Sequence, residues 1–119
     1  MQTGNSIAIP AILKVGSGTL GEIGVYLREA GLKQVVIYFG NGLIDLFGMR
    51  VMESLRQEEI TVMEYQELDT VCMDDIIRLA FSLPNKVQAV ISIGGGKVID
   101  AGKYAAFLRN IPFISVATS

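Results

Sequence analysis

The feature that most constrains the fold is a buried-strand pattern that runs directly into three glycines. Residues 87–93 are mostly apolar and rich in β-branched side chains, which is typical of a strand buried on both faces of a sheet. Gly94, Gly95 and Gly96 follow, and a helical pattern begins at once. In open α/β sheets this arrangement leaves backbone N–H groups free at the start of the helix, where the helix dipole adds partial positive charge. The stretch therefore predicts an anion site, with phosphate as the expected ligand.

The spacing matches neither of two common phosphate-binding motifs. Ile99 stands where the dinucleotide fingerprint has its third glycine, and Val98 stands where a P-loop has its Ser or Thr. A triple glycine alone is a weak signal, because it is also compatible with a tight turn between a strand and a helix. The motif by itself leaves both interpretations open.

Predicted strands and helices alternate along the chain. Extended segments are expected at residues 7–15, 35–39, 61–65, 87–93 and 113–116. Helices are expected at residues 19–30, at 43–59 with a break near Gly48, from Asp74 or Asp75 to about Leu83, and at 97–109. Short connections between alternating elements predict one α/β domain over residues 1–119. Its expected architecture is Rossmann-like, with three layers, a parallel sheet and helices on both faces.

Three helices carry further signatures. Thr19 and Glu22 have the spacing of a capping box. The acidic pair Asp74 and Asp75 favours the positive end of a helix dipole, an interpretation we prefer over a metal site. The helix at residues 97–109 is apolar on most sides, which predicts that it is buried on more than its sheet side.

Composition excludes several classes of partner. Only 18% of the residues are charged, the net charge is −2, and Lys and Arg are not clustered in the sequence. No nucleic-acid surface is therefore predicted. No apolar run approaches the ~20 residues of a membrane span, and the first residues lack the features of a signal peptide. The single cysteine, Cys72, rules out an internal disulfide. We therefore expect a cytoplasmic protein without membrane contact.

Two further properties of the composition bear on function. Half of the residues are hydrophobic, which predicts a face that packs on a partner, either by self-association or against another domain. The chain has no histidine, so it lacks the commonest general base and the commonest metal ligand.

Four stretches together are similar to a known family: Gly94–Asp100, Lys103–Ala106, Ile111–Phe113 and Thr118–Ser119. They resemble the cofactor-binding half of the iron-containing alcohol dehydrogenase, glycerol dehydrogenase and glycerol-1-phosphate dehydrogenase superfamily, whose fold is shared with dehydroquinate synthase. The resemblance begins near Ile9 and covers nearly all of the chain, but only about the first third of such an enzyme.

The resemblance implies a role for each matching position. The glycine loop would hold the diphosphate of NAD or NADP, and the Thr-Ser pair would lie near the diphosphate and the nicotinamide ribose; the residues concerned are Gly94, Gly95, Gly96, Lys97, Thr118 and Ser119. Asp100 matches an acidic position of the family, although it equally fits a helix cap or a partner of Lys103 or Tyr104.

The choice between NAD and NADP stays open in the sequence. The glycerol dehydrogenases that the chain resembles commonly carry an Asp near the end of the second strand, but this chain has Gly40-Asn41-Gly42 there, with no Lys or Arg beside them. Asn41 fits either a hydrogen bond to the ribose or a simple turn.

The family's divalent metal (Zn, Fe or Ni) is held by an Asp and two His of a helical domain, next to an alcohol or polyol phosphate substrate. None of those residues is present here, so we expect the 119-residue chain to be inactive alone.

Two alternatives remain: a stand-alone nucleotide-binding or interaction domain without catalysis, and a lyase of the dehydroquinate synthase type. A phosphoryl-accepting receiver domain is rejected, because the predicted strands end in Val15, Phe39 and Tyr65 instead of carboxylates.

Overall fold

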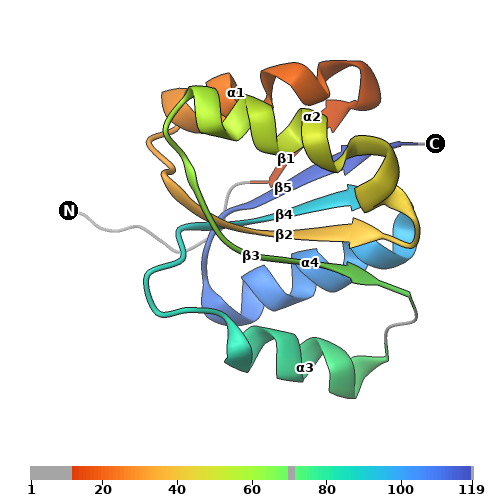
Figure 1. Cartoon of the computed structure of the whole chain (residues 1–119). Helices are drawn as coiled ribbons and strands as arrows, with labels where there is room; N and C mark the ends of the chain where they lie inside the picture. The colour runs from red at the N-terminus through yellow and green to blue at the C-terminus, as the bar shows by residue number, and fades with distance from the viewer. Residues whose placement is uncertain (1–11, 70–71, 119) are drawn as a thin grey trace.

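The computed structural model describes the backbone of residues 12–69 and 72–118, and the side chains of 20–69 and 72–118. These residues form one five-stranded, all-parallel sheet with the strand order β1-β5-β4-β2-β3 (Figure 1). The strands are β1 (Ile12–Gly16), β2 (Gln34–Gly40), β3 (Thr61–Leu68), β4 (Ala89–Gly94) and β5 (Phe113–Ala117). The helices are the 3-10 helix η2 (Ser17–Glu22), α1 (Ile23–Glu29), α2 (Leu43–Gln57), α3 (Met73–Ser82) and α4 (Gly96–Arg109).

The predicted three-layer architecture is confirmed. Helices α1 and α2 cover one face of the sheet, and α3 and α4 cover the other (Figure 1). None of the helices in the described part of the chain is long and apolar enough to span a membrane.

Alternate residues of the central strands fill two separate cores, because successive side chains of a strand point to opposite faces. The core beneath α1 and α2 contains Ile37, Phe39, Ile91 and Ile93, and the core above α3 and α4 contains Val36, Tyr38, Val90 and Phe113. Burial raises the pKa of Tyr38 to about 12, so its hydroxyl stays neutral at physiological pH. The contiguous apolar pattern of β2 and β4 follows from this burial on both faces.

Several predicted boundaries differ from the structure. The first helix begins as the 3-10 helix η2 and becomes α-helical only at Ile23. Helix α2 is continuous through Gly48, which is buried within it. Strand β3 extends three residues beyond the predicted end at Tyr65, to Leu68. Residues 7–11 of the first predicted strand and the side chain of Thr19, with its capping box, lie outside the described residues.

Helix α4 packs on the sheet and on α3 at close range. A Cβ at Gly102 would overlap the hydroxyl oxygen of Ser92 in the centre of β4, so only glycine lets the helix axis approach this strand so closely. At its C-terminal end, Arg109 donates hydrogen bonds from Nη1 to the carbonyl oxygens of Ala80 and Leu83, at 2.6 and 2.9 Å, which ties α4 to the end of α3. The middle of α4 is thereby held against β4, and its C-terminal end is held against α3.

Helix α4 is buried on more than its sheet side, as predicted, because it also packs on α3, but its outer side faces solvent. Tyr104, Phe107 and Leu108 are exposed, whereas Ala101 and Ala105 face the sheet and are buried. The apolar residues that surround most of this helix in the sequence therefore include a stripe that faces solvent in the described structure.

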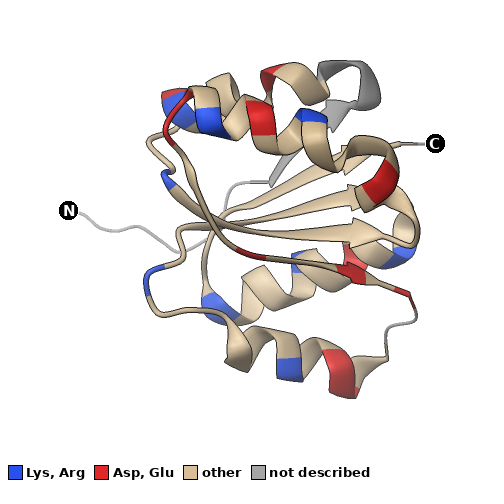
Figure 2. Ribbon diagram, in the orientation of Figure 1, with Lys and Arg blue, Asp and Glu red and all other residues tan. Residues whose placement is uncertain are grey.

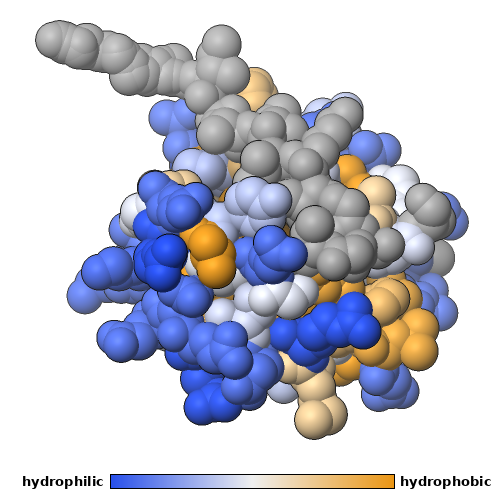
Figure 3. All heavy atoms as spheres, turned by 90° about the horizontal axis from the view of Figure 1, so that it is seen from above, coloured by the Kyte–Doolittle hydropathy of each residue, from blue (hydrophilic) through white to orange (hydrophobic). Residues whose placement is uncertain are grey.

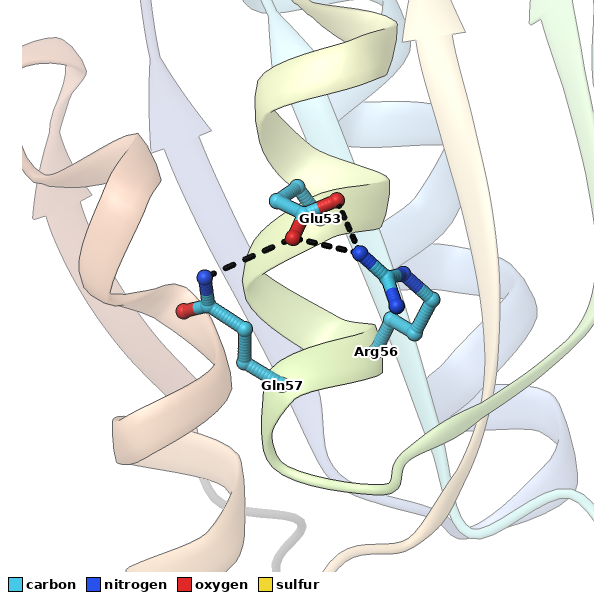
Figure 4. A network of polar contacts seen from close by, with 3 residues as sticks. All are labelled: Glu53, Arg56 and Gln57. Carbon is cyan, nitrogen blue, oxygen red and sulfur yellow. Dashed lines mark hydrogen bonds and ion pairs between the residues drawn. The ribbon is translucent and has the colours of Figure 1, made fainter.

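The outer surface of α2 carries a small polar network. Arg56 Nη2 donates to both carboxylate oxygens of Glu53, at 2.6 Å each, and the amide of Gln57 lies 3.5 Å from one of them (Figure 4). The hydrogen bond from Arg56 holds the pKa of the Glu53 carboxyl below its usual range. Because both side chains are largely exposed, the pair contributes little to the stability of the fold.

Candidate functional site

A pocket of about 230 Å³ lies at the carboxyl edge of the sheet, where β4, β2 and β3 end side by side. Its lining residues come from three loops that are distant in sequence: Gly40, Asn41, Leu68, Asp69, Gly95, Gly96, Lys97 and Val98. Four of the predicted site residues, Asn41, Gly95, Gly96 and Lys97, are thus brought together. In parallel α/β sheets, ligands bind at this edge, outside the carboxyl ends of the strands.

The start of α4 has the backbone geometry of an anion site. Gly95 occupies the N-cap position, and no side chain caps the helix. The first N–H groups of a helix have no partner within it, so those of α4 face the pocket together with the positive end of the helix dipole. The ammonium group of Lys97 adds a full positive charge at the same edge. In Figure 2 a basic segment marks the start of α4, and acidic residues mark the end of β3 across the sheet.

The glycines at positions 95 and 96 are not required by the protein's own packing. A Cβ at either position would have no protein atom within 4 Å, and Gly95 has φ −93°, which any residue can adopt. A tight strand-to-helix turn therefore does not account for these two residues. They leave an open cradle at the helix start, with room for a ligand to contact the backbone closely.

Gly94 lies behind the pocket and is held by the packing of the loop. Its φ of +147° lies in a region that favours glycine, and a Cβ there would lie 2.7 Å from Val98 Cγ1 and 3.2 Å from the Gly40 nitrogen. The residue is buried and is not among the pocket's lining residues. Its carbonyl oxygen accepts a hydrogen bond from the Thr118 N–H at 3.3 Å. Gly94 thus shapes the loop and ties it to the end of β5.

Thr118 and Asp100 lie beside the pocket without lining it. The β4–β5 register pairs Gly94 with Ala117, which brings Thr118 next to the glycine loop as the sequence predicted. Asp100 is in the second turn of α4, so of the structural roles considered it does not cap the helix. Its carboxylate lies 4.0 Å from the ammonium of Lys103, one of the two partners considered. Ser119 is outside the described residues.

The second helix start at this edge is already occupied by a carboxylate. Glu67, at the end of β3, accepts hydrogen bonds from the Gly42 N–H at 3.1 Å and the Ile44 N–H at 3.0 Å, one to each of its oxygens. These N–H groups belong to the N-terminus of α2, which has no cap from its own N-cap residue, Gly42. Of the two helices that begin beside the pocket, only α4 keeps its N-terminus available to an anion.

The sequence missed Asp69 as a residue of the site. The predicted strand ends at Tyr65, but β3 continues to Leu68, and Asp69 follows directly. The register pairs Leu68 with Gly40, so Asp69 lies beside Asn41 at the pocket. The statement that no strand ends near a carboxylate, used to reject a receiver domain, is therefore wrong for β3. Only knowledge of which strands are neighbours would have shown this.

A larger pocket of about 440 Å³ lies elsewhere, between α2 and the edge strand β3. Its lining is mostly apolar and includes Phe39, Met49, Met52 and Tyr65, with Asp45 as its single charged residue. Figure 3 shows the face that α1 and α2 cover, which is hydrophilic over much of its described surface with a hydrophobic area to one side. This second pocket offers no cation and no free helix start, so we do not assign the anion site to it.

The acidic pair Asp74 and Asp75 lies in the first turn of α3, at the helix start. The Asp75 carboxylate accepts a hydrogen bond from the Cys72 N–H at 3.3 Å and forms a capping box with the N-cap residue Cys72. Hydrogen bonds from the Cys72 side chain and backbone lower the pKa of the Asp75 carboxyl. The described residues contain no group of three His, Cys, Asp or Glu side chains placed to hold a metal ion.

Comparison with known proteins decides which family this geometry belongs to. The family model for iron-containing alcohol dehydrogenase matches residues 14–119. The chain belongs to the iron-containing alcohol dehydrogenase family. As a member of this family, it is similar to a glycerol-1-phosphate dehydrogenase [NAD(P)+] from Saccharolobus islandicus, with 34% identity over 95% of this chain and 32% of the relative. It thus spans about a third of the length of the curated relatives it matches.

Solved structures agree with this placement in the iron-containing alcohol dehydrogenase family. The NADH-dependent butanol dehydrogenase A of Thermotoga maritima superposes with a TM-score of 0.62 at 27% identity, over 89% of this chain and 27% of that one. The glycerol dehydrogenase of Schizosaccharomyces pombe has a TM-score of 0.72 at 22% identity, over 98% of this chain and 30% of that one. The second comparison shows the shared fold alone.

Proposed function

We propose that this chain is the NAD(P)-binding domain of a metal-dependent dehydrogenase that acts on glycerol phosphate, a polyol or another alcohol. One observation carries the proposal: the uncapped start of α4 opens into the pocket through two glycines that nothing in the protein's own packing requires. The names of the relatives support the cofactor class and the substrate class. The exposed free thiol of Cys72 fits a reducing cytoplasm.

In this proposal the residues of the pocket bind and orient the dinucleotide. The N–H groups at the start of α4 hold the diphosphate, and Lys97 adds a charge-assisted contact. Asn41 lines the pocket across from these groups, and its side chain would form a hydrogen bond to the ribose. When bound, NAD(P) accepts a hydride from the alcohol. Gly94 and Thr118 keep the loop in position through their backbone hydrogen bond.

The metal and the alcohol would be bound by other residues. The curated relatives are about three times as long as this chain, which supports a helical domain that supplies a site for Zn, Fe or Ni in the longer protein. We therefore expect the described residues to hold the dinucleotide but not to polarise the alcohol.

Removing the charge of Lys97 tests the site directly. Lys97→Ala should weaken NADH binding about fivefold, because an exposed ionic contact to phosphate contributes roughly 1 kcal/mol. Isothermal titration calorimetry on the 119-residue chain measures this. Lys103→Ala is the matched control, since Lys103 lies on the same helix but pairs with Asp100 and does not line the pocket. Equal affinities of the parent and Lys97→Ala would argue against the proposed orientation of the diphosphate.

We also propose that the outer face of α3 and α4 associates with an apolar partner surface. Phe81 is 83% exposed, Phe107 67% and Leu108 54%, in contrast to the buried alanines of the sheet side. The 119-residue chain should therefore self-associate, and in the longer protein the same face would pack on the helical domain. Sedimentation should show dimers or larger species, and the double variant Phe81→Glu, Phe107→Glu should shift them to monomer. A parent that stays monomeric over a wide concentration range and binds no hydrophobic dye would contradict this.

A further inference from the structure

The part of the pocket farthest from the glycine loop has a distinct electrostatic character. From Gly96 the lining continues across Gly40 and Asn41, which carry no charge, to Leu68 and Asp69 at the end of β3. Asp69 is exposed, and its carboxylate makes no hydrogen bond or ion pair with any other described residue. A ligand whose diphosphate sits at the start of α4 therefore extends toward this free carboxylate.

At this end, the described lining of the pocket itself offers neither a cation nor a free helix N-terminus to bind phosphate. Lys97 is the one cation among the described lining residues, and it lies on the α4 side. The N–H groups of Gly42 and Ile44, which would otherwise form a second anion site, already donate to Glu67. One basic residue, Arg78 of α3, lines a neighbouring pocket together with Glu67 and Asp69, and its guanidinium lies 4.0 Å from the Asp75 carboxylate. Three carboxylates, Glu67, Asp69 and Asp75, thus surround this single cation at the end of β3.

The two pyridine dinucleotides differ only at the 2′-oxygen of the adenosine ribose. In NAD this is a hydroxyl, which donates a hydrogen bond to a carboxylate. In NADP it carries a phosphate with a charge of about −1.5 to −2 at neutral pH, by analogy with other phosphate monoesters. A carboxylate within a few ångströms repels that phosphate, and among the described residues on this side three carboxylates outnumber the single cation, Arg78.

We propose that Asp69 makes this site select NAD over NADP, an inference that rests on the proposed function. The sequence shows no acidic residue at the end of β2, where the resembled dehydrogenases commonly carry one. The structure assigns the equivalent task to the neighbouring strand, because β3 ends at Leu68, level with Gly40, and the next residue, Asp69, lies at the same pocket. Glu67 supports this selectivity, because it already accepts the N–H groups at the start of α2 that could otherwise bind a phosphate.

Calorimetric titration of the 119-residue chain with NAD⁺ and with NADP⁺ tests this inference. The parent should bind NAD⁺ at least about tenfold more tightly, and Asp69→Asn should bring the two affinities within about threefold of each other. The preference of the parent should also shrink as salt is raised, since Asp69 is exposed. Asparagine keeps the size of the side chain and a hydrogen-bond acceptor, so the variant removes mainly the charge.

Glu64→Gln is the matched control. It removes a carboxylate from the same strand, five residues and about 16 Å earlier, which is farther than the ~10 Å screening length at 0.1 M salt. It should leave the affinity ratio unchanged. Equal binding of both dinucleotides by the parent, or an unchanged ratio in Asp69→Asn, overturns the inference but leaves the proposed function standing. If neither dinucleotide binds the parent, the proposed function is wrong and the inference falls with it.

Discussion

Gly102→Val should destabilise the domain by about 3–4 kcal/mol, a large share of the 5–15 kcal/mol by which a typical domain is stable. A Cβ at this position would overlap the Ser92 hydroxyl oxygen and lie 2.8 Å from Phe113 Cε1. Ser92 is in the centre of the sheet and Phe113 is buried, so neither moves away without disturbing the core. Urea denaturation followed by circular dichroism should show a large fall in the midpoint.

Two further variants separate this clash from a general intolerance of substitution. The hydroxyl of Ser92 is buried and has no hydrogen-bond partner in the described structure, so Ser92→Ala should cost little by itself. It should also recover part of the stability lost in Gly102→Ala, because it removes the overlapped atom. Gly21→Ala, whose Cβ would meet no atom within 4 Å, serves as the neutral control. A stable Gly102→Val protein would mean that α4 does not lie against β4 as described.

Gly95→Asp should abolish detectable dinucleotide binding, with a loss of more than a hundredfold, in a protein that still folds. The side chain would fill the space that the phosphate oxygens need, and its carboxylate would repel them at close range. Losing one or two charge-assisted N–H contacts, at ~1.5–3 kcal/mol each, accounts for an effect of this size. The backbone tolerates the change, since φ is −93° and no protein atom lies within 4 Å of the new Cβ.

Asparagine at the same position distinguishes steric exclusion from charge. Gly95→Asn has nearly the same volume as Gly95→Asp without the negative charge, so it should weaken NADH binding less. Circular dichroism and urea denaturation confirm folding before each titration. A folded Gly95→Asp protein with the affinity of its parent would show that the glycine loop does not hold the diphosphate.

The central elements of the fold were predictable because local sequence determines them. Strands β2 and β4 are buried on both faces, so their apolar runs are unbroken and their boundaries nearly match the prediction. Helix α4 was predicted within one residue of its start at Gly96. The glycine loop could be named as a candidate anion site for the same reason, since its chemistry is contained in consecutive residues.

The far side of the pocket was not predictable because it depends on which strands are neighbours. Strand β3 is an edge strand with many exposed residues, so Glu64-Tyr65-Gln66-Glu67 shows no clear pattern and its end was placed too early. Glu67 caps a helix that begins more than twenty residues earlier, a contact set by the β2–β3 register. Asp69 reaches the pocket through the same register.

The strand order has a consequence for the synthesis of this protein. Strand β1 pairs only with β5 among the described strands, and Ile12 lies opposite Phe113. Because a ribosome releases the amino-terminal end first, β1 emerges long before its partner exists. Until β5 is made, the backbone N–H and C=O groups of β1 have no strand to pair with, and the apolar residues that β5 covers stay exposed. A nascent chain halted before Phe113 is therefore expected to need a chaperone, although most of its helices and strands have already been translated.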